Sequence, residues 1–90
     1  DAYLGAKDYH RALETATRCI DEAPAPRKAT VTYCRLRRAQ AYDLSGRREE
    51  ALKEYAEVRR RPDFFDSRDK ARRGLKRAPT YDEVVVQLLE

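Results

Sequence analysis

A helical-hairpin pattern occurs twice in this 90-residue chain, the second copy starting 39 residues after the first. In the fuller copy, residues 41–62, Gly46 separates the end of one predicted helix from the start of the next. The tyrosine precedes the first alanine by nine residues in both copies. The matched positions are Tyr42, Ala51, Tyr55 and Pro62 in this copy and Tyr3, Ala12, Ala16 and Pro24 in the earlier one. A repeated helix pair predicts a solenoid, in which each pair buries its apolar face against the next.

The composition favours helices throughout. Charged residues make up 40% of the chain and hydrophobic residues 41%, with neither Trp nor Met. Strong helix formers such as Ala, Leu, Glu, Lys and Arg are abundant, and runs of β-branched residues are rare outside 84–86. A chain of this length supports one domain with a modest core. We therefore expect a single all-α domain.

Apolar residues recur at helical spacing along most of the chain. Asp8 is placed to cap one helix, and Thr80 with Glu83 forms a capping-box motif for the last one. Gly74 lowers the intrinsic stability of its helix by about 1 kcal/mol relative to Ala. The predicted helices cover roughly residues 1–5, 8–21, 27–44, 48–60, 67–77 and 80–89.

The two cysteines and two adjacent phenylalanines are predicted to belong to the core. Cys19 and Cys34 are 15 residues apart in apolar helical patterns, and two cysteines alone define neither a metal site nor a redox pair. We expect both to be reduced and buried, as free cysteines commonly are. Phe64 and Phe65 stand in a loop before a helix, where we expect them to cover the edge of the core.

Residues 35–62 resemble the tetratricopeptide repeat (TPR) family, whose 34-residue unit is a helix-turn-helix. Ala39 stands at the small-residue site and Tyr42 at the Tyr site of the first helix. The second-helix sites are held by Ala51, Tyr55 and Val58 here, and by Ala12, Ala16, Cys19 and Pro24 in the upstream copy. The resemblance implies antiparallel helix-turn-helix repeats stacked as a short right-handed superhelix.

On this reading residues 1–90 form one TPR-like domain. Residues 1–24 would be the end of a truncated first repeat, 27–62 a complete repeat, and 63–90 a degenerate or capping repeat in which 81–85 opens the second helix. Two departures from the family are Arg35 and Arg38, which occupy its usual Trp and Leu sites. The chain opens in mid-pattern without Met, so we expect it to be a fragment of a longer solenoid.

The resemblance implies a protein–protein interaction scaffold, because the first helices of such repeats line a concave groove. Residues 27–48 hold seven Arg or Lys against one acid, and residues 59–77 hold nine against three. The predicted partner is therefore an acidic peptide or helix with some apolar character. The residues matched to inward-facing sites are Tyr33, Leu36, Arg37, Gln40, Leu44, Arg73, Lys76 and Arg77.

Other readings stay open. Self-association is one, because a truncated repeat exposes apolar side chains such as Tyr3 and Tyr9. Fifteen arginines invite nucleic-acid binding, but the net charge is only +4 and acids interleave with the bases. One TPR subfamily clamps acidic chaperone tails, and Arg37 matches one of its clamp residues while Tyr33 replaces another.

The sequence predicts no enzyme. It contains one histidine, His10, in a surface-like stretch, and no glycine-rich phosphate loop or nucleophile elbow. We expect no catalytic residue, metal, cofactor or small-molecule substrate. No signal peptide or transmembrane run is present, and we expect no membrane partner. The sequence leaves the location open, with the cytoplasm favoured.

Overall fold

The computed structural model describes residues 2–22 and 28–89, and these residues form six α-helices without a strand. The helices are α1 (Ala2–Gly5), α2 (Tyr9–Glu22), α3 (Lys28–Leu44), α4 (Arg48–Arg60), α5 (Ser67–Lys76) and α6 (Tyr81–Leu88). Each lies where the sequence predicted a helix, so the all-α class is confirmed. Gly46 has a positive φ of 83° and makes the turn between α3 and α4 as expected.

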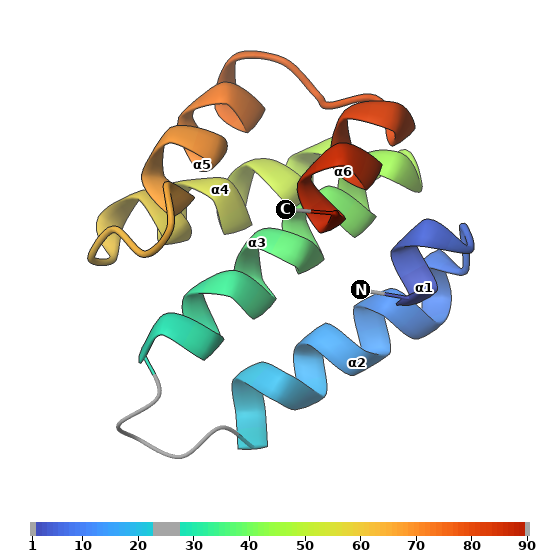
Figure 1. The fold of residues 1–90 in the computed structure, drawn as a ribbon, viewed down its shortest axis with the longest axis horizontal. Coiled ribbons are helices and arrows are strands. Elements are labelled where there is room, and N and C mark those ends of the chain that lie inside the picture. The colour runs from blue at the N-terminus through green and yellow to red at the C-terminus, as the bar shows by residue number, and fades with distance from the viewer. Residues whose placement is uncertain (1, 23–27, 90) are drawn as a thin grey trace.

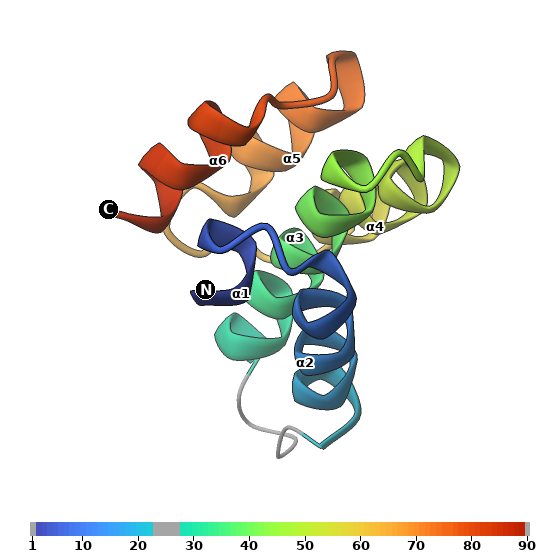
Figure 2. The same cartoon turned by 90° about the vertical axis from the view of Figure 1, so that its right-hand side faces the viewer.

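Helix α3 is the centre of the arrangement. It packs along α2 on one side and along α4 on the other, and it also reaches α5 (Figure 1). The helices from α2 to α5 follow one another as antiparallel neighbours. The two short terminal helices, α1 and α6, lie on the same side of α3 and touch each other (Figure 2). We call the side of α3 that is next to α1 and α6 its inner face. This face is bordered by both ends of the described chain.

The main core lies between α3, α4 and α5. Small side chains let these helices approach closely, so the ring of Tyr55 is buried against the backbone of α5. A Cβ added at Gly74 would lie 2.5–2.8 Å from atoms of that ring, so this close packing requires glycine. The buried members of the cluster are Leu36, Ala39, Ala51, Tyr55, Val58 and Ala71.

A second buried cluster joins the two ends of the chain. Its members are Leu4 of α1, Ala12 of α2, Ala41 of α3 and Val84 of α6. The Tyr81 hydroxyl donates a hydrogen bond to the carbonyl of Gly5 in the same region. The buried contact of α6 is therefore with α1, α2 and α3, although α6 follows α5 in the chain.

The predicted capping box of α6 is confirmed. The Thr80 hydroxyl accepts a hydrogen bond from the Glu83 amide at 3.2 Å, and the Glu83 carboxylate accepts one from the Thr80 amide at 3.1 Å. At α2, the Asp8 carboxylate accepts from the Arg11 amide at 3.2 Å, as its predicted capping role requires. Both helices therefore begin at the residues that the sequence indicated.

Arg35 and Arg38, which stand at the positions matched to the TPR Trp and Leu sites, form ion pairs to α4 and a hydrogen bond to α2. Arg35 and Arg38 of α3 contact the same oxygen of Glu54 on α4, at 3.4 and 2.9 Å. The second guanidinium also donates to the hydroxyl of Thr17 on α2 at 3.1 Å. All three charged side chains are mostly buried, with 12–21% of their surface exposed. Charge pairing thus replaces the apolar packing expected at these sites.

The prediction that the cysteines are reduced is wrong. Cys19 of α2 and Cys34 of α3 form a disulfide, with their Cα atoms 6.2 Å apart. The two helices run antiparallel side by side, which places positions 15 residues apart in the sequence directly opposite each other. The pairing depends on this tertiary arrangement, which the spacing of the two cysteines does not reveal.

We expect the Gly74→Ala substitution to destabilise the protein, although Ala is the better helix former. The added methyl would overlap the Tyr55 ring, and overpacking of this kind costs about 1–3 kcal/mol. Gly5→Ala is the matched control, because a Cβ there meets no atom within 4 Å. Urea unfolding of both variants checks this, and a Gly74→Ala variant as stable as the wild type would contradict the close packing.

Candidate partner-binding surface

The structure separates the predicted site residues into buried and accessible ones. Leu36 has no exposed surface and belongs to the main core, so its predicted place on the groove surface is corrected. Leu44 is half-buried against the cluster that joins the chain ends. Leu36 and Leu44 therefore support the helices rather than offer contact area. The others lie around the inner face of α3 and the C-terminal end of α5.

Gln40 connects α3 to α6. Only 2% of its surface is exposed, and its amide oxygen accepts a hydrogen bond from Arg37 at 2.8 Å. Its amide nitrogen donates to the side-chain oxygen of Gln87 on α6 at 2.7 Å. A predicted partner-binding residue is thus engaged by a helix of the chain itself.

The predicted basic residues near the end of α5 face acidic groups. Arg77 pairs with Glu83 at the start of α6 at 2.9 Å, and Arg73 pairs with Asp69 on its own helix. Lys76 is exposed. Together with Gln40 and residues of α6, these three basic side chains line a hollow of about 230 Å³ between α5 and α6. Of these three basic residues, Arg77 therefore already pairs with a carboxylate of α6.

Glu83 is stabilised in its charged form. The backbone amide of Thr80, the guanidinium of Arg77 and the hydroxyl of Thr80 lower the pKa of this carboxyl below its ordinary value. The Thr80 amide and the Arg77 guanidinium donate hydrogen bonds to this carboxylate, which lies in the first turn of α6. The charge of Glu83 thus links the cap of α6 to the end of α5.

Tyr33 is the centre of a separate, more open region. The guanidinium of Arg37 and the ammonium of Lys70 lie 5.7 and 5.6 Å from the centre of its ring. Its hydroxyl donates a hydrogen bond to the carbonyl of Phe65 at 2.7 Å, and the two rings meet edge to face. An aromatic pair with two cations beside it is therefore fixed on this face.

The predicted core role of Phe65 is wrong, because 81% of its surface is exposed. Phe65 and Asp66 both have left-handed backbone angles, with φ values of 52° and 62°. Non-glycine residues adopt this conformation rarely. Two such residues in succession turn the chain so that the Phe65 ring faces solvent beside Tyr33.

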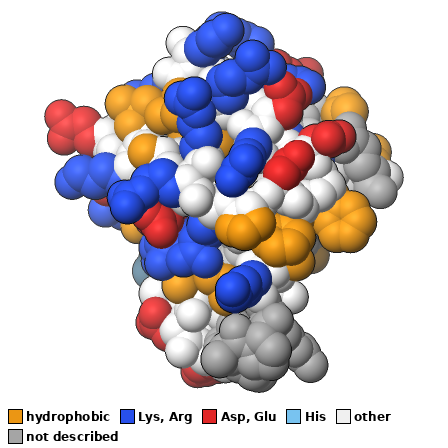
Figure 3. Space-filling view, turned by 90° about the vertical axis from the view of Figure 1, so that its left-hand side faces the viewer, with side chains coloured by type: hydrophobic (Ala, Val, Ile, Leu, Met, Phe, Trp, Pro, Cys, Tyr) orange, Lys and Arg blue, Asp and Glu red, His pale blue; other side chains and the backbone are white. Residues whose placement is uncertain are grey.

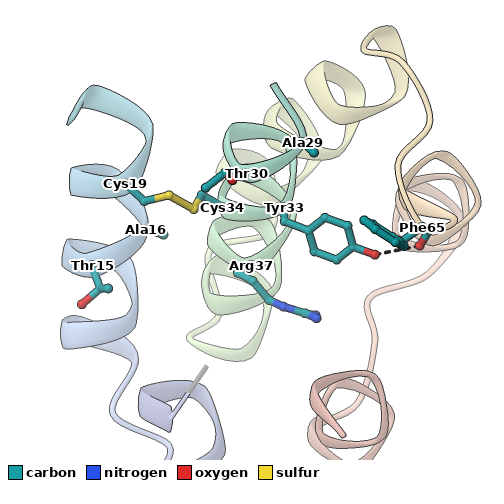
Figure 4. Close-up of a pocket in the computed structure, with 9 residues that line it drawn as sticks. All are labelled: Thr15, Ala16, Cys19, Ala29, Thr30, Tyr33, Cys34, Arg37 and Phe65. Atoms are coloured by element: carbon teal, nitrogen blue, oxygen red, sulfur yellow. Dashed lines mark hydrogen bonds between the residues drawn. A yellow bond between two sulfur atoms is a disulfide. The ribbon is translucent and has the colours of Figure 1, made fainter. Parts of the chain in front are cut away.

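An apolar hollow with a volume of about 460 Å³ lies between α2, α3 and this aromatic pair. Figure 4 shows the disulfide joining the two helices at one side and Tyr33 and Phe65 together at the other. An adjoining hollow of about 430 Å³ shares Tyr33, Arg37 and Phe65 and extends to α6. The larger hollow is lined by Thr15, Ala16, Cys19, Ala29, Thr30, Tyr33, Cys34, Arg37 and Phe65.

The surface on the side shown in Figure 3 is rich in cations. Lys and Arg side chains gather from the top of this face, where α5 ends, down to its middle, with some acidic groups among them. Groups of hydrophobic side chains lie beside them. This combination of positive charge and apolar surface suits an acidic segment that also carries apolar side chains.

Residues 2–22 and 28–89 offer neither a metal-ligand cluster nor a membrane-spanning helix. No group of three or more His, Cys, Asp or Glu side chains is placed to hold a metal ion there. None of the helices in these ranges is long and apolar enough to cross a membrane.

Sequence reasoning missed Phe65, Lys70 and the disulfide as parts of this surface. Lys70 lies in the basic stretch 59–77, but its position beside Tyr33 depends on the packing of α5 against α3. The only sequence signal for Phe65 is a second large apolar residue directly after Phe64 in a loop. Such a pair cannot both enter the core when the backbone turns between them.

Comparison with known protein families, curated proteins and solved structures found no match for this chain.

Reduction of the disulfide should lower the free energy of unfolding by about 3 kcal/mol, the value typical of a closed loop of this length. Urea unfolding with and without dithiothreitol measures the effect. The Cys19→Ser, Cys34→Ser double variant is the control, since its stability should not respond to the reductant. Equal stability of the wild type under both conditions would contradict a structural disulfide.

Acid should weaken the attachment of α6. Because the folded-state pKa of Glu83 is lowered, its stabilisation is complete above the ordinary value of 4.5 and is lost as the pH falls through the folded-state value. Urea midpoints measured between neutral pH and pH about 3 should fall more for the wild type than for Glu83→Gln. Parallel curves for the two proteins would show that this carboxylate does not contribute.

Proposed function

We propose that this chain is a protein-interaction module of the TPR type that binds an acidic, partly apolar segment of another protein. In this proposal the helix pairs stack as a short right-handed superhelix and present the inner face of α3 and the end of α5 to the partner. The repeated hairpin pattern and the antiparallel order of α2 to α5 support it.

The observation that carries the proposal is the position of α6. This helix has Asp82 and Glu83 in its first turn, and then a largely apolar sequence. It matches the predicted ligand in chemistry, and two residues predicted from the sequence hold it: Arg77 by an ion pair at 2.9 Å and Gln40 by a hydrogen bond at 2.7 Å. The chain thus contains an internal example of the segment that its basic face accepts.

The same face continues beyond α6 to Tyr33 and Arg37. There it is bordered by two cations and by apolar hollows large enough for side chains of a partner. Arginine suits carboxylate recognition because its planar guanidinium donates hydrogen bonds to both oxygens. A partner segment would therefore be recognised through carboxylates along the basic side and apolar groups in the hollows.

The test uses fluorescence anisotropy with labelled peptides of sequence EELFEE and KKLFKK. We expect the acidic peptide to bind the full chain at least about ten times more tightly than the basic one, because of charge complementarity. The triple variant Arg37→Glu, Arg73→Glu, Arg77→Glu should lose about tenfold or more in affinity for EELFEE.

The matched control is Arg18→Glu, Arg59→Glu, Arg60→Glu, which makes the same change in net charge at exposed positions elsewhere. It should retain most of the affinity. Circular dichroism verifies that both variants stay helical. Equal loss in the two triple variants would reduce the effect to net charge, and unchanged binding by the first would refute the basic face as the site.

A further inference from the structure

We propose that the hollow between α2, α3 and Phe65 is the anchor site for one large apolar side chain of the partner segment. A carboxylate of the same segment would lie against Arg37 and Lys70. This inference rests on the proposed function and adds the position and chemistry of the anchor. The occupant is an acidic partner segment in which a leucine or phenylalanine stands next to Asp or Glu.

The shape and lining of the hollow fit such a side chain. Its volume of about 460 Å³ exceeds that of any single side chain, and apolar atoms of Ala16, Ala29 and the disulfide form much of its wall. Thr15 and Thr30 add hydroxyl groups at the same wall. Apolar pockets with a few polar groups are typical of binding sites, because burial supplies affinity and the polar groups fix orientation.

The wall of the hollow is held in place before any partner arrives. The disulfide fixes α2 against α3, and the hydrogen bond from Tyr33 to the Phe65 carbonyl fixes the loop to α3. Preorganised sites lose less entropy on binding. Reduction of the disulfide should therefore weaken peptide binding as well as stability.

The conformation of the loop supports a binding role for Phe65. Two successive left-handed non-glycine residues are unfavourable, and here they hold a phenylalanine in water instead of in the core. Such strain is found most often at functional sites. A partner side chain in the hollow would cover the exposed ring. The apolar surface that this ring now exposes to water would then be buried, which favours binding.

Charge complementarity selects the chemistry of the partner. Arg37 and Lys70 lie on the Tyr33 ring, where the larger hollow meets the adjoining one. Asp66 is the one acidic side chain among the residues of 2–22 and 28–89 that line these two hollows. The positive charge at their junction favours a carboxylate next to the anchoring side chain.

The experiment compares EELFEE with EEAAEE, in which the large apolar side chains are absent. On the full chain, EELFEE should bind about tenfold or more tightly, the effect expected for a buried anchor. Phe65→Ala should remove most of this difference, and Thr30→Trp should do the same by filling the hollow from an exposed position. Amide NMR shifts on adding EELFEE should centre on Thr15, Thr30 and Phe65.

Leu89→Ala is the matched control, because Leu89 is 82% exposed and lines neither hollow. It should leave the preference for EELFEE unchanged. If both acidic peptides bind equally, the anchor site is refuted while the proposed function stands. If neither binds, both fail. Sedimentation that shows a dimer abolished by Phe65→Ala would instead assign the hollow to a second copy of the chain.

Discussion

The contact between the Tyr55 ring and the backbone at Gly74 is the constraint on which the arrangement of α3, α4 and α5 depends. A large aromatic side chain fits between helices only where its neighbours are small, and Ala39, Ala51 and Ala71 meet this requirement. Burial raises the pKa of Tyr55 well above its usual range, and the nearby Asp43 carboxylate raises it further. The ring therefore stays neutral in the interior.

Polar contacts between helices add specificity to this packing. The Glu54 carboxylate is shared by Arg35 and Arg38, and the side chain of Asp43, only 1% exposed, pairs with Arg48 at 2.8 Å. Burial raises the pKa of Asp43, an effect that the arginine partly offsets. Removing one partner of a buried pair leaves an uncompensated charge, so these pairs favour one alignment of the helices. Together with the disulfide, they hold α2, α3 and α4 in a fixed relation.

Because α2, α3 and α4 are held in a fixed relation, the inner face of α3 has two distinct parts. Near the ends of the chain, α6 contacts α3 through Val84 and Gln87 and the end of α5 through Glu83, so that part is occupied by an acidic helix. Toward the start of α3, the surface stays open around Tyr33 and Phe65. Both proposals give these two parts the same ligand chemistry. The covered part is occupied by α6, an acidic segment of the chain itself, and the open part is where the partner segment would bind.

Local physics made the helices predictable. Their positions follow from apolar periodicity, from the capping residues Asp8 and Thr80, and from Gly46, whose left-handed angle ends α3 without steric cost. The same patterns did not show which way each side chain of a helix points. They could not reveal that Leu36 faces the core while Tyr33 lines a hollow. One turn of helix separates these residues, and only the neighbouring helices distinguish their faces.

The sequence by itself therefore determined the helical class, the turn and the caps, together with the basic stretches that supply Arg37 and Arg77. Only the tertiary structure decided the Cys19–Cys34 bond, the exposure of Phe65 and the seat of α6 on α3. The physical reason is the range of the interactions. Helix formation and capping depend on residues within four positions of each other. The disulfide, the hydrogen bond from Tyr33 that holds the Phe65 loop, and the contacts of α6 with α3 join groups that lie far apart in the chain until the helices pack.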